Sequence, residues 1–240
     1  RARRNIVAPA LLFRSAAAPR PYTGGEQGVL RVSETPLFDF KEFPVLETER
    51  LVLREIVLAD ADALMRIRGD YAVTRLNIGA AYISVEQARS LVRRMAQLYQ
   101  VRKELRWGIT LKEQGGATGS TDAPVVGMVG FNYWDRRDRR GSVGFDLARA
   151  YWGRGIMREA LREAVLPFGF ARMGLNRIEA ETSTENAASI RLLEALGFAR
   201  EGCKREQYFD EDAFHDLLLF SLLRRDPAAE SLFTPPPPPA

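Results

Sequence analysis

Two glycines on either side of an arginine, at the start of an amphipathic stretch, are the first residues that indicate chemistry. The segment from Tyr151 to Val165 reads YWGRGIMREALREAV, with Gly153 and Gly155 flanking Arg154. The first amides of a helix have no acceptor within the helix and carry partial positive charge, so they bind anions. Glycine lets a ligand approach where a Cβ would collide. The spacing predicts a phosphate-binding turn or, more plainly, a tight strand-to-helix turn.

The turn lacks the further residues of two common phosphate-binding motifs. No Lys-Ser or Lys-Thr follows the glycines as in a P-loop, and the third small residue of a dinucleotide-binding fingerprint is missing. Glycines alone are weak evidence for a ligand. Other parts of the chain have to show whether the turn binds an anion, and which one.

A second polar group opens a predicted helix further along the chain. In TSTENAASIRLLEALGF, Asn186 precedes the helix and Ser189 occupies its third position. Asparagine directly before a helix is among the best N-caps, and a first-turn serine commonly bonds to its own backbone. Both residues therefore have a structural interpretation beside any chemical one.

Composition excludes several classes of protein. Cys203 is the single cysteine and His215 the single histidine, which rules out an internal disulfide, a His-rich metal site and a Cys/His zinc site. The longest apolar run near the end, residues 217–223, is too short to span a bilayer. The net charge of +4 is mild, and residues 1–25 hold five arginines and no acid, so the remainder is nearly neutral. We expect a cytoplasmic protein without metal, membrane or nucleic-acid partner.

Periodicity divides the chain into three parts. Residues 1–44 show no sustained period and predict an arm or linker, residues 45–226 a folded domain, and residues 227–240 a Pro-rich tail. Helical spacing predicts helices over 58–69, 84–101, from 155 onward and over 187–196, and Pro167 is expected to kink or shorten the third. Strands are predicted at 50–56, 106–111, 124–134, 141–147, 177–182, 203–210 and 214–223. A strand–helix–strand crossover inside an otherwise antiparallel sheet defines a mixed α+β domain.

Four segments together resemble a known family. LETERLVLRE, YWGRGIMREAL, NAASIRLLEALGF and HDLLLFSLL occur in the order typical of GNAT-superfamily N-acetyltransferases of the RimJ/RimL-like branch, over about Val45 to Arg225. The resemblance implies a GNAT-type, mostly antiparallel sheet of six or seven strands with a central splay, flanked by about four helices. It also implies acetyl-CoA as cofactor and direct transfer of an acetyl group to a primary amine.

The resemblance assigns cofactor contacts residue by residue. The family's turn motif falls on Trp152, Gly155 and Met157, and Met157 departs from the small residue usual at the last position. The backbone near Phe145 and Leu147 would pair with the pantetheine arm, as would the Asn186 side chain. The full set of implied cofactor-binding residues is Phe145, Leu147, Trp152, Gly153, Arg154, Gly155, Ile156, Met157, Asn186 and Ser189.

Catalysis needs a proton donor for the departing thiolate and a base for the amine. The resemblance offers Ser189 and Tyr208 as rival donors, although Tyr208 is equally a strand aromatic packing on the core. Asp146, Glu179 and Glu181 are candidate bases on the two strands that flank the expected cleft. Alternation places Glu179 and Glu181 on one face of their strand, and the residues do not choose among the three carboxylates.

The acceptor and the partners stay open at this stage. A protein N-terminus or a small amine such as a polyamine, aminoglycoside or amino acid fits the chemistry, and residues 77–84 are expected to line the acceptor side. A homodimer is a further open partner. The rival interpretation is a non-catalytic GNAT-fold module that binds acyl-CoA as a sensor or interaction domain. His215 and Cys203 are expected to be structural, and Arg136, Arg137, Arg139 and Arg140 a solvated hairpin tip.

Overall fold

A computed structural model describes residues 38–76, 81–115, 122–210 and 212–233. The predicted arm up to residue 37 and the end of the Pro-rich tail lie outside these residues. The helices are α1 (Ala61–Arg68), α2 (Tyr71–Thr74), α3 (Val85–Gln100), α4 (Ile156–Glu159), α5 (Leu166–Ala171), α6 (Ala187–Ala195), α7 (Pro227–Glu230), the 3-10 turns η1 (Leu58–Asp60), η2 (Lys112–Gln114) and η3 (Arg149–Tyr151), and the π-helical turn η4 (Ala160–Val165). The strands are β1 (Leu46–Glu47), β2 (Leu51–Arg54), β3 (Leu105–Leu111), β4 (Gly127–Asp135), β5 (Arg140–Leu147), β6 (Arg177–Ser183), β7 (Ala199–Asp210) and β8 (Ala213–Leu223).

The strands form one mixed sheet in the order β1-β2-β3-β4-β5-β6-β8-β7. Every neighbouring pair is antiparallel except β5 and β6, which run parallel because a helical crossover joins them. The predicted α+β class is confirmed. The described sheet has eight strands rather than six or seven because the two-residue β1 adds to the predicted set, pairing Leu46 with Leu53.

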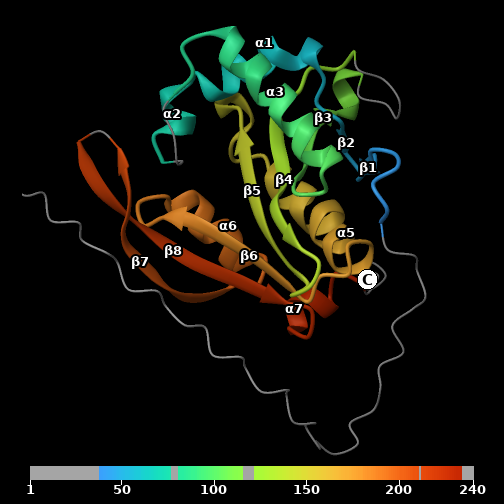
Figure 1. Cartoon of the computed structure of the whole chain (residues 1–240), viewed down its shortest axis with the longest axis vertical. Helices are drawn as coiled ribbons and strands as arrows, with labels where there is room; N and C mark the ends of the chain where they lie inside the picture. Colours follow the sequence, from blue (N-terminus) through green and yellow to red (C-terminus); the bar gives the residue numbers. More distant parts are fainter. Residues whose placement is uncertain (1–37, 77–80, 116–121, 211, 234–240) are drawn as a thin grey trace, which may run out of the picture. The chain divides into compact units, whose positions relative to one another are not determined.

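The centre of the sheet opens between β5 and β6. Their parallel pairing runs only from Arg140 opposite Arg177 to Val143 opposite Ala180, although both strands continue. Beyond these residues the strands diverge, and β6 continues alongside β8 as far as Ser183 opposite Leu217 (Figure 1). The predicted central splay is therefore present, and it leaves the last residues of β5 facing a gap.

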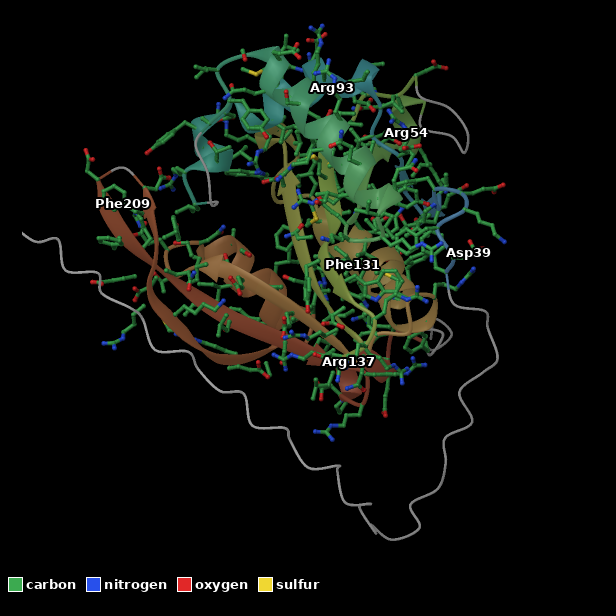
Figure 2. All side chains as sticks on the ribbon, viewed as in Figure 1. Asp39, Arg54, Arg93, Phe131, Arg137 and Phe209 are labelled. Carbon is green, nitrogen blue, oxygen red and sulfur yellow. The ribbon has the colours of Figure 1, made fainter. Side chains whose placement is uncertain are left out.

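Helices cover the two faces of the sheet with separate apolar clusters. Because side chains alternate along a strand, Val129 and Phe131 of β4 face the helices that follow β5, whereas Met128 faces the helices that precede β3. The first cluster includes Leu161 of η4, Phe170 of α5 and Leu193 of α6, and the second Leu64 of α1 and Val92 of α3. Figure 2 shows Phe131 inside, with Arg137 and Phe209 at the β4–β5 and β7–β8 turns.

The helix after the glycine turn corrects one part of the prediction for Pro167, which is that the helix is shortened there. Pro167 lies at the start of α5, and the chain stays helical from Ile156 to Ala171 instead of breaking. The preceding turn, η4, is a π-helix in which the amide of Leu166 bonds to Leu161, five residues back. This wider turn accommodates a residue that lacks an N–H and whose ring would clash with the carbonyl four residues earlier.

The packed core includes residues near both predicted ends of the domain. Phe38 is buried, and its ring lies 5.3 Å from that of Phe168 of α5 in an edge-on arrangement. At the other end Ala229 of α7 is buried in the same cluster. In the described ranges, no helix is both long and apolar enough to cross a membrane.

Candidate functional site

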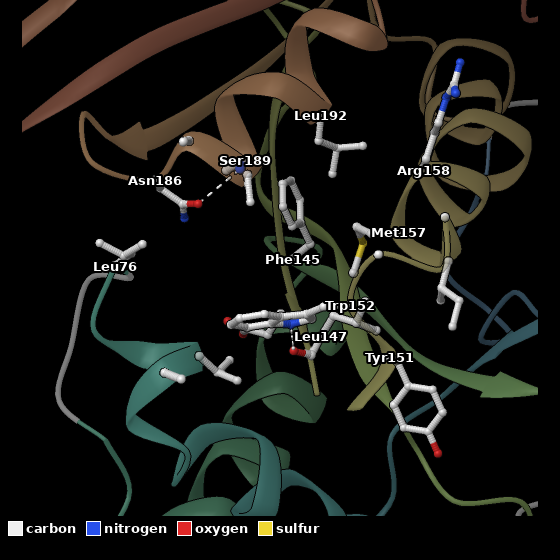
Figure 3. A pocket seen from close by; sticks show the side chains of 18 of the residues that line it. Leu76, Phe145, Leu147, Tyr151, Trp152, Met157, Arg158, Asn186, Ser189 and Leu192 are labelled. Atoms are coloured by element: carbon white, nitrogen blue, oxygen red, sulfur yellow. Dashed lines mark hydrogen bonds between the residues drawn. The ribbon is translucent and has the colours of Figure 1, made fainter. Parts of the chain in front are cut away.

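The glycine turn joins the end of β5 to the start of α4 in a conformation that glycine favours. Gly153 and Gly155 both have φ near +74°, in the left-handed region. The amide of Glu159 is the first to bond back into the helix, to the carbonyl of Gly155 at 3.0 Å. The amides of Ile156, Met157 and Arg158 precede that bond, so they have no intrahelical acceptor. The turn therefore presents unbonded amides at the start of α4, between Trp152 and Met157 of Figure 3.

A carboxylate and an arginine far apart in the sequence hold this turn in place. Glu159 accepts hydrogen bonds from the Thr48 hydroxyl at 2.5 Å, the Arg50 amide at 2.9 Å and the Arg50 Nε at 2.6 Å. Arg50 also donates from Nη1 to the carbonyl of Arg154 at 3.1 Å, within the turn itself. Burial alone raises the pKa of Glu159, but these donors outweigh it and hold the pKa below its usual value of 4.5.

The end of β5 presents backbone groups to the gap in the sheet. The amide of Ala148 bonds to the Val126 carbonyl of the neighbouring chain segment at 2.9 Å. Because antiparallel pairing alternates, the peptide groups of Phe145 and Leu147 point away from β4, toward the splay. The Leu147 carbonyl accepts from the Trp152 indole Nε1 at 2.8 Å, which fixes Trp152 over the strand end.

The polar residues that open α6 face the same gap. Asn186 caps the helix, its Oδ1 accepting from the Ser189 amide at 3.0 Å. The structural interpretation of Asn186 is thus correct, and it leaves the Nδ2 group of the carboxamide available to a ligand. Ser189 is only 8% exposed, and within the described part of the chain no hydrogen bond is found for its hydroxyl.

These elements enclose a hollow of about 470 Å³, which we call the turn cavity. Figure 3 shows Phe145, Trp152 and Met157 around it, with Asn186 and Ser189 at one side. Met157 is buried and its side chain forms part of the wall, so the bulkier residue narrows the cavity without removing its amide. The wall includes residues that sequence reasoning missed, which are Ala72, Val73, Arg75, Leu76, Tyr151, Arg158, Glu185, Ala187, Ala188 and Leu192.

A second hollow of about 350 Å³, the arginine cavity, lies beside the first. Arg68 of α1, Arg94 of α3 and Arg106 of β3 line it, together with polar residues of β4, β5 and β6. None of the three arginines stands in a recognisable motif, because the fold assembles them from separate elements. Both cavities share one stretch of wall, made of Leu76, Phe145, Asp146, Asn186 and Ser189.

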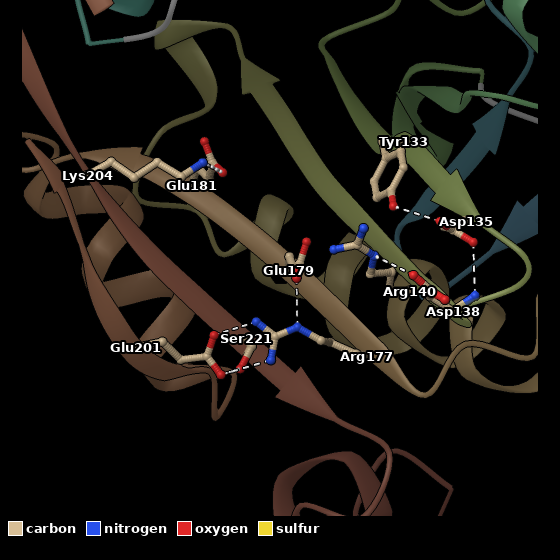
Figure 4. A network of polar contacts seen from close by, with 10 residues as sticks. All are labelled: Tyr133, Asp135, Asp138, Arg140, Arg177, Glu179, Glu181, Glu201, Lys204 and Ser221. Atoms are coloured by element: carbon tan, nitrogen blue, oxygen red, sulfur yellow. Dashed lines mark hydrogen bonds and ion pairs between the residues drawn. The ribbon is translucent and has the colours of Figure 1, made fainter. Parts of the chain in front are cut away.

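The three candidate bases occupy different positions. Asp146 lines both cavities, is nearly buried and pairs with Arg68 at 2.9 Å. Glu181 lines the arginine cavity and pairs with Lys204 Nζ at 2.6 Å. Glu179 lies further back on β6, and Figure 4 shows it in a separate network with Arg177 and Glu201.

The rival proton donor does not line either cavity, although it hydrogen-bonds to Ser183, which lines the arginine cavity. Tyr208 of β7 stacks on His215 with ring centroids 5.0 Å apart, and neither residue lines the two described cavities. Burial raises the pKa of Tyr208, and a hydrogen bond with Ser183 partly opposes the shift. His215 Nε2 lies 3.1 Å from the Asp210 carbonyl, which fits the structural role predicted for it.

Two further expectations concern the acceptor side and metals. Residues 77–80 of the predicted acceptor loop lie outside the described residues, but Tyr82 of that loop lines the arginine cavity. Among the residues that the structure describes, no group of three or more His, Cys, Asp or Glu side chains forms a metal site. Cys203 is exposed, with its Sγ 3.7 Å from Asp216.

Comparison with known proteins identifies the family. Residues 50–199, more than half of the chain, match the family described as "Acetyltransferase (GNAT) domain". The chain is 37% identical over 181 residues, 75% of its length and 97% of the relative's, to a protein named uncharacterized N-acetyltransferase p20 of Bacillus licheniformis. The chain therefore belongs to the GNAT family, as its four motifs predict, and it is an acetyltransferase.

Solved structures share the fold. RimL, named ribosomal L7/L12 alpha-N-protein acetyltransferase and solved with coenzyme A, matches with a TM-score of 0.64 and 20% identity over 75% of this chain and 98% of its own. The microcin C7 self-immunity acetyltransferase MccE, solved with acetyl-CoA and AMP, matches with a TM-score of 0.63 and 17% identity over 73% of this chain and 93% of its own. At these identities the likeness establishes the fold alone.

Proposed function

We propose that the protein is an acetyl-CoA-dependent N-acetyltransferase that moves the acetyl group directly to a primary amine. The observation that carries the proposal is the wall shared by the two cavities, where Ser189 and Asp146 border both. A donor bound on one side and an acceptor on the other would meet there. RimL with coenzyme A and MccE with acetyl-CoA support the choice of cofactor.

The residues of the turn cavity fit a coenzyme A molecule. Amides from Gly153 to Met157 would hold the pyrophosphate, since they precede the first intrahelical bond and lie at the positive end of the helix. The peptide groups of Phe145 and Leu147, which face the splay, would pair with the pantetheine arm as an added strand does. The carboxamide of Asn186 would add a side-chain donor from α6.

Coenzyme A would supply an activated acetyl group as a thioester. The Phe145 amide, directed into the gap, is placed to polarise the thioester carbonyl. The buried Ser189 hydroxyl would donate a proton to the departing sulfur, and it has the stronger geometric case because Tyr208 does not line either cavity. Glu181 or Asp146 would take the amine proton, directly or through water.

The acceptor is an amine of a protein N-terminus or of a small molecule. RimL is named a ribosomal L7/L12 alpha-N-protein acetyltransferase, which supports a protein N-terminus as one acceptor. We propose a cytoplasmic location, in keeping with a single, exposed and unpaired cysteine.

Two measurements test the proposal in order. Isothermal titration with acetyl-CoA should show one site with a dissociation constant of about 1–100 μM. Thiol release from acetyl-CoA, followed with a panel of primary amines and peptides, should then reveal turnover, with mass spectrometry of the acetylated product. Absence of coenzyme binding would refute the proposal. Binding without turnover of any amine would instead favour the sensor or interaction module.

A further inference from the structure

The arginine cavity is lined by three arginines but only two carboxylates, so its lining carries a net positive charge. Arg68, Arg94 and Arg106 converge on it from three elements, and Asp146 and Glu181 are the acidic residues in its wall. The turn cavity contrasts with this, because its proposed ligand contacts are mainly backbone amides. A basic side-chain cluster on the acceptor side is a feature that acetyl transfer itself does not require.

Ion pairs account for two of the three arginines. Arg68 pairs with Asp146, and Arg106 Nε lies 2.7 Å from Glu104 Oε1. Glu181 is itself matched by Lys204. Within the described ranges no ion pair or hydrogen bond involves the Arg94 side chain, so this cation is the surplus charge of the cavity.

The other two arginines retain donors for a ligand. The Nε of Arg68 is buried without a hydrogen-bond partner among the described residues. Arg106 donates from Nη2 to Asn132 Oδ1, and its side chain is 18% exposed. Burial lowers the pKa of Arg106, and repulsion from Arg94 and Arg68 adds to the shift although Glu104 opposes it. An anion in the cavity would relieve this repulsion.

Two glycines let neighbouring groups pack closely on the sheet beside Arg106. Gly130 lies opposite Arg106 and Gly144 lies opposite Gly130, so two neighbouring strands carry no side chain beside Arg106. A Cβ at Gly144 would lie 2.3 Å from Asn132 Nδ2, and one at Gly130 would lie 2.2 Å from the Leu105 carbonyl. The Asn132 side chain therefore lies directly over Gly144, where it accepts from Arg106 at the edge of the arginine cavity.

We propose that the acceptor carries a carboxylate close to its reacting amine, bound by Arg94 and Arg106 while the amine lies between Asp146 and Glu181. The inference rests on the proposed function and narrows its acceptor. Charges of the cavity are ordered across the sheet: Arg106 is on β3, Asp146 on β5 and Glu181 on β6. Strands lie about 4.8 Å apart, so β3 and β5 are separated by about 10 Å. Arginine side chains reach across part of that distance, which places the carboxylate within a few bonds of the amine.

An amino acid and a peptide with an acidic N-terminal segment both present this chemistry, and paired acceptors distinguish them. The first pair is alanine and alaninamide, and the second is the amidated peptides Ser-Asp-Asp-Gly and Ser-Asn-Asn-Gly. Thiol release from acetyl-CoA gives kcat/KM for each. We expect a preference of about tenfold or more for the carboxylate member of one pair, the size of a charge-assisted hydrogen bond. The pair that shows it identifies the source of the carboxylate.

Two matched variants test whether the preference for a carboxylate acceptor comes from the arginine cavity. Arg94→Gln should reduce the ratio of kcat/KM for carboxylate over carboxamide about tenfold, mainly through KM of the carboxylate. Arg93→Gln is the control, because Arg93 is the adjacent arginine of α3 but pairs with Glu86 at 2.8 Å and does not line the cavity. It should leave the ratio within about twofold, as expected of an exposed ion pair.

The outcomes separate this inference from the proposed function. Equal kcat/KM for both members of both pairs, with turnover present, overturns the inference and leaves the proposed function intact. If acetyl-CoA binds and no amine is turned over, the proposed function fails. The inference is then decided by isothermal titration of the two peptides in the presence of coenzyme A, where equal affinities would refute it and tighter binding of the acidic peptide would support it.

Discussion

The turn cavity and the arginine cavity meet at Ser189 but are built in opposite ways. The turn cavity depends on backbone groups from short, continuous segments, Gly153–Met157 and the end of β5, and on glycines with positive φ. The arginine cavity depends on long side chains from α1, α3 and β3. Backbone donors are present whatever the side chain at their position, whereas a side-chain donor is removed by a single substitution. We therefore expect changes in the two regions to separate coenzyme binding from acceptor choice.

The largest effect should come from the residue where the cavities meet. Ser189→Ala removes the hydroxyl that we propose as proton donor, so kcat should fall about 100-fold while the dissociation constant of acetyl-CoA changes little. Tyr208→Phe should change kcat by less than about threefold, because Tyr208 lines neither described cavity. Steady-state thiol release and isothermal titration measure both quantities. The opposite ranking of the two variants would return the role to Tyr208.

A side chain at Gly155 should damage the turn cavity alone. Gly155→Val forces a β-branched residue to φ near +74° and puts carbon beside the anion seat. We expect about tenfold or weaker acetyl-CoA binding. Gly115→Val is the control for strain, because Gly115 also has positive φ, near +84°, with open space around its Cβ position and no place in either cavity. Both variants should lose about 1–2 kcal/mol of stability, so equal coenzyme affinity would contradict the account.

The stabilisation that Glu159 gives to the glycine turn should depend on pH. Glu159→Gln weakens the bonds from Thr48 and Arg50, and we expect about 1.5–3 kcal/mol lower unfolding free energy at pH 7. Because the folded-state pKa of Glu159 lies below the usual 4.5, its stabilisation is complete above that pH and is lost as pH falls through the folded pKa. Urea unfolding at pH 7 and at acidic pH measures the difference between variant and wild type, which should shrink on acidification.

Glu163, on the same helical segment, is the control for the Glu159 variant. Burial, together with Glu159 and Glu49, raises the pKa of Glu163, so its charged form gives no stabilisation above that pKa. Glu163→Gln should change the unfolding free energy at pH 7 by less than about 0.5 kcal/mol. A Glu159→Gln variant as stable as Glu163→Gln at pH 7 would show that the turn does not depend on this carboxylate.

The smallest effect separates the two roles of Asn186. Asn186→Ala should cost about 1 kcal/mol of stability through the lost N-cap, whereas Asn186→Ser keeps a capping oxygen. Both variants lose the carboxamide donor, so acetyl-CoA affinity should fall by a similar, modest factor of about two to five in each. If the serine variant binds acetyl-CoA as the wild type does, Asn186 is a cap and nothing more.

The two regions also differ in how far the sequence predicts them. The turn residues, Asn186 and Ser189 are local in sequence, so spacing and the family resemblance located them. The structure brings them to one cavity, except for Arg154, which lines a different hollow. The α+β class followed from the strand–helix–strand crossover, and the central splay was implied by the family resemblance. Functional residues that are close in sequence form a motif, and a motif can be recognised before the fold is known.

Contacts between distant segments leave no such pattern. Arg50 and Glu159 are separated by 109 residues, and neither stands out before the chain is folded. The same holds for Arg68, Arg94 and Arg106, which look like ordinary solvated arginines on predicted helices and a strand. The continuous helix through Pro167 was also not predictable, because a π-helical turn depends on packing as well as on the proline itself.

The most direct test of the two-cavity account is a crystal structure with coenzyme A and the N-acetylated form of the acceptor that is turned over best. The account predicts the pyrophosphate on the amides from Gly153 to Met157 and the coenzyme sulfur within hydrogen-bonding distance of the Ser189 hydroxyl. It also predicts the acceptor carboxylate against Arg94 and Arg106. A coenzyme bound away from the glycine turn, or an acetylated amine outside the arginine cavity, would contradict it.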